Sequence, residues 1–389
     1  MFFLGIDIGK NTHVASLIDD NKNVIFKAFS FSNTVIGAQS LLEKLTHVAE
    51  SLEIGMEATG HYWLSLYSFL VEKGFCVHVI NPIQTDGWRR GIEIRKRKTD
   101  IIDSILIADL IRYGDFVETS LANEDLLSLR NLTRFRSYLV SSVGDLKRKS
   151  IALLDQVFPE YESTFSDIFG KTSKEILRNL SSPSDFEDLS CDKLNSILEN
   201  IRDKNFAKMK INQLSDKAKS SFGVNMCLDS FSLQIKFLIE QIAFIDEQIK
   251  VVENEINSIM QKINSPITTI PGVGSVTGAV ILGEIGDISR FSNPSKLVAY
   301  AGIDATVSQS GEYEATINRM SKRGSAYLRR ALFQSALRAE FCDPVFSAYY
   351  QKKISQGKHH LVATNAVARK LVHTIFAVLV KNEAYQVQI

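Results

Sequence analysis

The order of strand and helix patterns in the first 85 residues constrains the fold of this chain more than any other feature. Three apolar segments with the composition of short strands come first, and helix and strand patterns then alternate. The segments are residues 2–9, 13–20 and 23–31 (strands), 36–52 (helix), 53–58 (strand), 63–74 (helix) and 75–82 (strand). This order is typical of a ribonuclease H-like α/β domain, which we predict for the N-terminal part of the chain.

Four carboxylates occupy this part of the chain in unusual positions. Asp7 and Glu57 each interrupt an apolar strand pattern, where an unpaired charge is costly. Asp100 and Asp103 have the i, i+3 spacing that places both on one face of a helix, with Thr99 as its expected N-cap. A divalent cation is the simplest counter-charge for such acids, so the four carboxylates predict a metal site.

Two other interpretations of these residues are open. Taken singly, Asp7 and Glu57 are ordinary strand-end residues, and the Asp100 and Asp103 pair suits the N-terminal end of a helix dipole. The segment DIGKNTH is also compatible with the first phosphate loop of sugar kinases and actin-like ATPases. Those proteins need a second glycine-rich loop, which the sequence lacks. The basic run directly before Thr99 favours the metal site.

From about residue 120 to 262 the sequence pattern is helical. Long helices are expected at 126–158 and 230–263, and a polar, irregular stretch at 181–193 lies between them. In the second helix apolar residues recur at alternating spacings of three and four, as in the seam of a coiled coil. They are Ile235, Leu238, Ile242, Ile245, Ile249, Val252, Ile256, Ile259 and Ile263. This predicts a coiled coil, within one chain or between two, with packing into the monomer's own core as the alternative.

A third region begins where Pro266 and Pro271 break the helical pattern. The segment PGVG resembles the turn of a helix-hairpin-helix element, in which the backbone at Gly272 and Gly274 faces a DNA phosphate. A tight turn without a ligand is the alternative. The expected fold class is α/β plus all-α, with a mostly helical C-terminal domain. The expected domains are 1–160 (α/β with a trailing helix), 161–262 (helical, coiled coil) and 263–389 (C-terminal domain).

Basic residues are clustered although the net charge is only +1. Phosphate contacts from Lys and Arg contribute affinity without sequence information, so two clusters are candidate nucleic-acid surfaces, with a solvated face as the alternative. The clusters are Arg89, Arg90, Arg95, Lys96, Arg97 and Lys98, and Lys322, Arg323, Arg329 and Arg330. Trp88 is a candidate for stacking on bases, whereas Trp63 is expected in the core.

Other classes of protein are disfavoured. The four cysteines have no CxxC spacing, which argues against a zinc knuckle and indicates a reducing compartment. The opening MFFLGID is too short and too soon acidic for a signal peptide, and the apolar stretch at 371–380 is too short to span a bilayer. We expect a cytoplasmic protein without a membrane partner.

Four motifs, taken together and in order, resemble one known family. They are GIDIGKNTH (5–13), GMEATGHYW (55–63), KTDIIDS (98–104) and a C-terminal block from IPGVGSVTGAVILGEIGD to SKRGSAYLRRAL (270–332). The set is similar to the DEDD transposases of the IS110 insertion-sequence family. The similarity runs from the first residues to about residue 340 and is weakest in the middle helical part.

The resemblance implies a fold and a set of catalytic residues. It implies a RuvC-like N-terminal domain in which the four carboxylates named above hold Mg²⁺ or Mn²⁺, a coiled-coil insertion, and a C-terminal domain with a serine nucleophile. That nucleophile is expected at Ser310 of SQSG, with Ser308 as the alternative. Ala305 stands where the family usually carries a proline.

Ser310 also has a case from the residues alone. SQSG lies between an apolar helix pattern and the basic segment SKRG, so it is expected in a loop near phosphate-binding groups. A serine hydroxyl is a weak nucleophile, and no histidine lies close in the sequence, so a metal or a carboxylate must activate it. An ordinary Ser-Gly turn is the alternative.

The resemblance further implies a reaction and its partners. Members recombine their own element, and an element-encoded bridge RNA pairs with donor and target DNA. A homo-oligomer is implied, dimer or tetramer, in which RuvC-like and C-terminal domains of different protomers form composite active sites. Its place would be the bacterial or archaeal cytoplasm, at the nucleoid.

We therefore expect a transposase that cleaves and rejoins DNA through a serine-linked intermediate. One alternative is a RuvC-like junction resolvase that uses water as its nucleophile. Another is a non-catalytic protein that binds RNA or DNA, against which the four intact acids argue.

Overall fold

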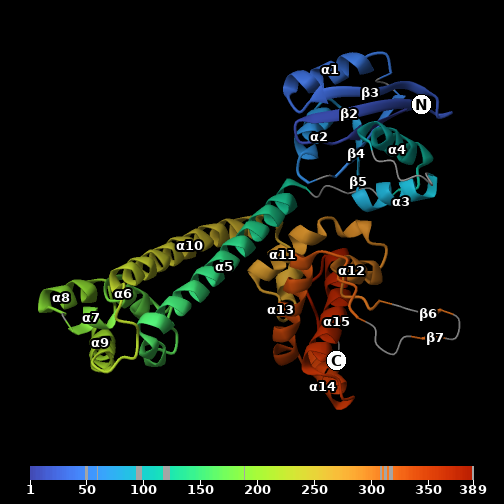
Figure 1. Cartoon of the computed structure of the whole chain (residues 1–389). Coiled ribbons are helices and arrows are strands. Elements are labelled where there is room, and N and C mark those ends of the chain that lie inside the picture. Colours follow the sequence, from blue (N-terminus) through green and yellow to red (C-terminus); the bar gives the residue numbers. More distant parts are fainter. Residues whose placement is uncertain are drawn as a thin grey trace. The chain divides into compact units, whose positions relative to one another are not determined.

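The computed structural model describes residues 1–48, 51–58, 60–92, 99–116, 123–187, 189–306, 309–310, 313–314 and 319–387, with the backbone alone at 92, 309, 310, 313 and 314. The chain divides into two compact units, residues 1–121 and 122–389 (Figure 1). Each unit has its own hydrophobic core and is described by itself.

A five-stranded mixed sheet forms the centre of the N-terminal unit, in the order β3–β2–β1–β4–β5 (Figure 1). β1 (Phe2–Asp7) pairs antiparallel with β2 (Thr12–Asp19), and β2 pairs antiparallel with β3 (Val24–Ser32). β4 (Leu52–Glu57) lies parallel to β1, and β5 (Cys76–Ile80) lies parallel to β4. This mixed sheet is consistent with the predicted RNase H/RuvC-like domain.

Different helices cover the two faces of the sheet. The helices are α1 (Val35–Leu45), α2 (Trp63–Glu72), α3 (Pro82–Ile92) and α4 (Asp100–Tyr113). Leu4 and Ile6 of β1 pack in a core with α1 and α2, whereas Phe3 packs with α4 on the opposite face. Because side chains alternate along a strand, Asp7 lies on the same face as Phe3, toward α4.

Local sequence signals explain the limits of these helices. The side chain of Thr99 accepts a hydrogen bond from the backbone N–H of Ile102, so Thr99 is the N-cap of α4, as predicted. Gly74 and Gly114 follow α2 and α4 with φ of 86° and 81°, a left-handed conformation that glycine adopts without steric cost. Trp63 is buried in the core, also as predicted.

Two long antiparallel helices dominate the first half of the second unit (Figure 1). They are α5 (Glu124–Val157) and α10 (Leu228–Ile263), and ion pairs from Asp125 to Lys262 and from Arg136 to Glu253 record their antiparallel register. All nine predicted seam residues of α10 are buried or partly buried in the apolar cores of this unit. The seam therefore packs within the chain.

Short helices fill the segment between α5 and α10. They are η2 (Pro159–Thr164), α6 (Lys171–Asn179), α7 (Pro183–Glu187), α8 (Cys191–Glu199) and α9 (Lys204–Ala218). The prediction of an irregular stretch at 181–193 was wrong, because this segment contains α7 and the start of α8. Helices of five and nine residues are too short to produce a clear hydrophobic period. Their start signals, Pro183 at the first position and Ser190 as an N-cap, are nevertheless present.

The rest of the second unit is a helical bundle (Figure 1). Its elements are η3 (Pro266–Thr269), α11 (Ser275–Ile285), η4 (Ile288–Arg290), α12 (Pro294–Ala301), β6 (Gln309–Ser310), β7 (Tyr313–Glu314), α13 (Ala326–Cys342), α14 (Pro344–Ser355) and α15 (His360–Lys381). Of the helices that the structure describes, α15 has the length and composition to cross a membrane. Its buried residues, Leu371 and Ile375 among them, belong to the core of the bundle.

Candidate active site

Asp7 and Glu57 end two neighbouring parallel strands. The register pairs Ile6 with Met56, so the next residues along β1 and β4 are the two acids. Neighbouring strands lie about 5 Å apart, and the alternation of side chains points both acids to the face that α4 covers. The sheet therefore brings together two carboxylates that are fifty residues apart in the sequence.

Two glycines let α4 approach this face closely. A Cβ at Gly5 would lie 1.9 Å from the carbonyl oxygen of Ser104, and a Cβ at Gly55 would lie 2.9 Å from the Ile111 side chain. At Gly5 the contact is with backbone and excludes a larger residue, whereas at Gly55 the Ile111 side chain would have to shift. The glycines of GIDIG and EIGMEA therefore permit close packing of α4 on the sheet. The first turn of the same helix carries Asp100, one turn before Ser104, and Asp103, directly before it.

The four predicted acids are electrostatically coupled in the structure. The pKa of Asp7 is raised from its ordinary value of 3.8 to about 6, first by burial and then by the negative charges of Asp103, Asp100 and Glu57. A hydrogen bond from the backbone N–H of Ile8 only partly opposes this rise. The acids therefore form a site with too much negative charge, which a cation would relieve.

Helix α3 supplies two polar partners that the sequence did not reveal. The hydroxyl of Thr85 donates to Oε2 of Glu57 at 2.7 Å, and the guanidinium of Arg89 pairs with Oδ1 of Asp103 at 2.8 Å. Thr85 and Arg89 are spaced i, i+4, so one face of α3 serves both acids. That spacing is the only sequence signal for this role.

The donor set suits a hard divalent cation. Carboxylate oxygens are the ligands that Mg²⁺ and Mn²⁺ prefer, and the raised pKa of Asp7 marks a missing counter-charge. Among the residues that the structure describes, no three His, Cys, Asp or Glu side chains lie close enough to hold one metal ion. The Arg89 side chain, 15% exposed, already neutralises Asp103. Metal binding would therefore compete with this ion pair.

The predicted serine lies in the other unit of the chain. Ser310 is the last residue of β6, and its backbone pairs with that of Tyr313 in β7, so Ser310 stands at the end of a two-stranded hairpin. Its side chain, and Ser308 altogether, lie outside the described residues. The stem of this hairpin is described. Ala305 forms a bridge with Met320, and the backbone N–H of Thr306 donates to the carbonyl of Arg319 at 2.8 Å.

The predicted basic residues have different environments. Arg95, Lys96, Arg97 and Lys98 lie outside the described residues. Arg90 is 76% exposed and pairs with Asp86, whereas Arg89 is engaged with the acids. In the second cluster Lys322, Arg323 and Arg330 are exposed. The guanidinium of Arg329 instead donates to the carbonyl oxygen of Ala301 at 3.2 Å, which holds the base of the hairpin.

The PGVG turn joins η3 to α11. Gly272 has φ of 85°, and a Cβ there would lie 2.3 Å from the carbonyl oxygen of Ser335, so its glycine is required by close packing on α13. Gly274 is exposed and is the N-cap of α11, but its N–H donates to Oγ1 of Thr277 at 2.9 Å. The next backbone N–H groups of α11 are the ones at the helix start that a phosphate would meet.

Comparison with known families gives two matches along the chain. A transposase profile of the IS110 DEDD type matches residues 4–159, which include all four acids. A second profile, described as the transposase IS116/IS110/IS902 family, matches residues 264–351, which include Ser310 and the second basic cluster.

Three relatives illustrate how far the similarity extends. A pilin gene-inverting protein of Moraxella bovis is 25% identical over 391 residues, which cover 100% of this chain and 98% of the relative. An uncharacterized 44.8 kDa protein of insertion element IS116 from Streptomyces clavuligerus is 26% identical, over 97% of this chain and 94% of the relative. An uncharacterized 43.6 kDa protein of insertion element IS110 from Streptomyces coelicolor is 33% identical over 120 residues, which are 31% of this chain and 29% of the relative.

Proposed function

Because this chain belongs to the IS110 family of transposases and is a DNA-recombining enzyme, we propose that it cleaves and rejoins DNA with Ser310 as its nucleophile. Asp7, Glu57, Asp100 and Asp103 form the metal site of this reaction. The observation that carries the proposal is the coupling of the four acids, in which burial first and then the charges of the other three raise the pKa of Asp7 to about 6. A cation would neutralise such a cluster and would contact the DNA phosphate.

Membership in a DEDD transposase family indicates dependence on a divalent metal. The ion is Mg²⁺, with Mn²⁺ as a substitute, because the donors are all carboxylates. Bound there, it would supply positive charge to the scissile phosphate and favour the ionised form of a nearby hydroxyl. Thr85 holds Glu57 in place from α3, and the ion would compete with Arg89 for Asp103.

The proposed chemistry is an exchange of phosphodiester bonds. The Oγ atom of Ser310 forms a bond to phosphorus, the bond to the departing deoxyribose oxygen breaks, and the serine proton ends on that oxygen. Attack by the hydroxyl of another strand reverses these changes and frees the serine. Because the intermediate keeps a phosphodiester bond that hydrolysis would break, the strands are rejoined without a further energy source.

The name of one relative supports rejoining over simple hydrolysis. A protein described as gene-inverting must reconnect every strand that it cuts, which a serine-linked intermediate does directly. A RuvC-like junction resolvase, the second candidate, would use water and would leave each cut open. The four acids serve either reaction, so the serine is what distinguishes the two.

The substrates of a transposase are DNA. We propose that an element-encoded bridge RNA selects donor and target, with the protein contacting backbones through Lys322, Arg323 and Arg330 and through the run at 89–98. The acids and Ser310 lie in separate units of the chain. Composite active sites in a dimer or tetramer would bring them together. The expected location is the cytoplasm, at the nucleoid.

The experiment is trapping on a suicide DNA substrate whose departing strand is lost after cleavage. The purified protein, loaded with its guide RNA and Mg²⁺, is expected to form a covalent protein–DNA adduct. Ser310→Ala should form none, and Ser308→Ala, the matched control two residues away, should form it normally. An adduct with Ser310→Ala would overturn the serine assignment, and cleavage without any adduct in the unmodified protein would favour the junction resolvase.

A further inference from the structure

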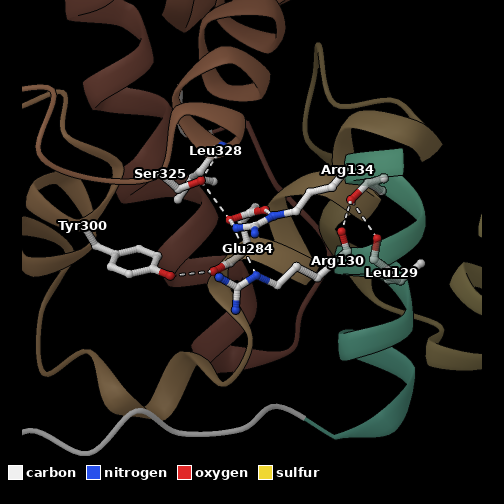
Figure 2. A network of polar contacts seen from close by, with 8 residues as sticks. Leu129, Arg130, Arg134, Glu284, Tyr300, Ser325 and Leu328 are labelled. Atoms are coloured by element: carbon white, nitrogen blue, oxygen red, sulfur yellow. Dashed lines mark hydrogen bonds and ion pairs between the residues drawn. The ribbon is translucent and has the colours of Figure 1, made fainter. Parts of the chain in front are cut away.

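A buried carboxylate lies at the point where α5, α11, α12 and α13 meet. The side chain of Glu284, on α11, is fully buried (Figure 2). Gly283 makes this position possible, because a Cβ there would lie 2.7 Å from the backbone nitrogen of Arg130. Helices α11 and α5 are therefore in backbone contact beside Glu284.

Two arginines of α5 neutralise Glu284. The guanidinium of Arg134 donates to both carboxylate oxygens, at 2.6 and 3.0 Å, and Arg130 lies 3.9 Å away (Figure 2). Burial alone would raise the pKa of Glu284, but the hydrogen bonds from Arg134 and Ser325 and the charges of both arginines lower it below its ordinary value. Glu284 is therefore ionised at neutral pH, and its Arg134 contact is bidentate and fixed in direction.

The same residue contacts both ends of the segment that carries Ser310, residues 303–322, which we call the serine segment. Before it, the hydroxyl of Tyr300 donates to the carbonyl oxygen of Glu284 at 3.0 Å. After it, the hydroxyl of Ser325 donates to Oε2 of Glu284 at 2.8 Å (Figure 2). Ser325 is also the N-cap of α13 and accepts from the N–H of Leu328, so this contact fixes where α13 begins.

Backbone contacts draw the two ends of the serine segment together. The N–H of Ser325 donates to the carbonyl of Tyr300 at 3.2 Å, and the N–H of Lys322 donates to the carbonyl of Gly302 at 3.1 Å. A Cβ at Gly324 would lie 1.7 Å from the oxygen of Tyr300, so the two ends touch through backbone alone. Any shift of Glu284 would therefore move both ends of the segment at once.

We propose that Glu284 is a positioning residue for strand transfer, which fixes the serine segment to α5 through its carboxylate contacts with Arg134 and Ser325 and its main-chain contact with Tyr300. A buried ion pair adds little net stability compared with apolar packing, because desolvation offsets its attraction. What the Arg134–Glu284 ion pair supplies instead is a fixed relative orientation of its two side chains, because the contact is bidentate. Helix α5 follows α4, which bears Asp100 and Asp103, after residues 114–123. Glu284 therefore links the serine segment to α5, the helix that follows α4 in the sequence.

This inference rests on the proposed role of Ser310, and one matched pair of variants tests it. Glu284→Gln removes the buried charge next to Arg134. Glu253→Gln, on α10, removes a partly exposed charge that pairs with Arg136 of the same helix α5. Misplacement of a nucleophile by about 1 Å costs about 100-fold in rate. We expect that loss in single-turnover adduct formation at saturating DNA for Glu284→Gln, with DNA affinity unchanged, and a wild-type rate for Glu253→Gln.

Hydrogen exchange separates positioning from general stability. In Glu284→Gln, exchange should rise in peptides covering 299–306 and 319–328 and stay unchanged in the cores of α13 and α15. A uniform rise over the bundle would overturn the inference, as would a wild-type adduct rate in folded Glu284→Gln. Tyr300→Phe, which deletes a single hydroxyl, covers the case in which Glu284→Gln does not fold. One lost hydrogen bond predicts a decrease of about fivefold in the same rate, and a wild-type rate would contradict the proposal.

The two proposals fail in different ways. If the unmodified protein forms no adduct, the assignment of Ser310 fails, but the exchange experiment still decides whether Glu284 anchors the segment. If the adduct forms and depends on Ser310, while Glu284→Gln leaves both its rate and local exchange unchanged, only the anchoring role is wrong.

Discussion

Two acids in this molecule, Asp7 (partly buried) and Glu284 (fully buried), have opposite electrostatic states, and the difference separates a site for a ligand from a structural contact. Asp7 lies among three other carboxylates, and burial and their charges raise its pKa to about 6. Glu284 is more deeply buried, yet the arginines of α5 and Ser325 hold its pKa below the ordinary value. Burial is therefore not what distinguishes a functional acid. The distinguishing feature is a counter-charge that the protein does not supply.

A third acid supports this interpretation within the N-terminal unit itself. Asp109 is on the same helix as Asp100 and Asp103 and is only 2% exposed. Burial would raise its pKa, but hydrogen bonds and charges from Lys22 and Arg112 lower it. The helix thus carries a neutralised acid at one end and two acids of the coupled cluster at the other.

The largest expected effect distinguishes Asp7 from Asp109 by activity. Asp7→Asn should reduce adduct formation by about 1000-fold or more, because the charge that holds the cation at the reacting phosphate is lost. Asp109→Asn removes a more deeply buried charge outside the site and should retain the wild-type rate. Single-turnover trapping on the suicide substrate measures both. Equal losses in the two variants would show that the comparison reflects fold rather than function.

The next effect concerns the stability of the second unit. Arg134→Ala leaves Glu284 with Arg130 alone, 3.9 Å away. We expect the free energy of unfolding to fall by about 2 kcal/mol, a value below that of a fully buried pair because 37% of the Arg134 side chain is exposed. Urea denaturation followed by far-ultraviolet circular dichroism measures this change. Both tryptophans, Trp63 and Trp88, lie in the N-terminal unit, so their fluorescence transition should not move.

The same comparison predicts that Asp7→Asn, unlike Arg134→Ala, raises the free energy of unfolding when no metal is bound. Its folded pKa exceeds its ordinary value of 3.8, so its contribution to folding is fully present below pH 3.8 and is lost as the pH rises through about 6. Above pH 6 the ionised group destabilises the metal-free unit. Asp7→Asn should then stabilise that unit by about 1 kcal/mol, a value reduced for partial exposure.

Tryptophan fluorescence during urea denaturation in EDTA, at pH 4 and pH 8, tests this sign. The stabilisation should be present at pH 8 and absent at pH 4, and Mg²⁺ should reverse it at pH 8 because the ion binds the charged form. A destabilised Asp7→Asn at pH 8 without metal would mean that Asp7 already has a counter-charge.

The sequence predicts the helices and strands that carry these sites better than it predicts which charged side chains pair. Apart from α3 (Pro82–Ile92), which was not expected, strand and helix order in the first 113 residues follows from local patterns, so the positions of Asp7, Glu57 and Asp100 at element ends are predictable. The long helices were likewise expected at 126–158 and 230–263 and are found at Glu124–Val157 and Leu228–Ile263. Turn and cap residues, such as Thr99, act over a few positions and can be recognised without a structure.

The partners of the acids could not be predicted in this way. Arg89 was expected to contact nucleic acid because it opens a basic run, and the sequence did not predict that its guanidinium, on α3, pairs with Asp103 of α4. Glu284 and Arg134 are 150 residues apart, and no local pattern connects them. Packing of distant elements decides which arginine neutralises which acid, and a single sequence carries no direct record of it. The assignment of Ser310 stays a prediction for the same reason.

The smallest expected effect concerns Glu253, an acid at the surface of the pair of helices α5 and α10. Glu253 and Arg136 form an ion pair of 2.6 Å, as short as that of Glu284 and Arg134, but their side chains are 31% and 28% exposed. Water screens such a pair, so Glu253→Gln should change the free energy of unfolding by about 0.5 kcal/mol or less. Urea denaturation of this variant beside Arg134→Ala measures the difference on one helix. Equal losses would mean that burial does not set the value of these contacts, and the contrast between Asp7 and Glu284 would then need another explanation.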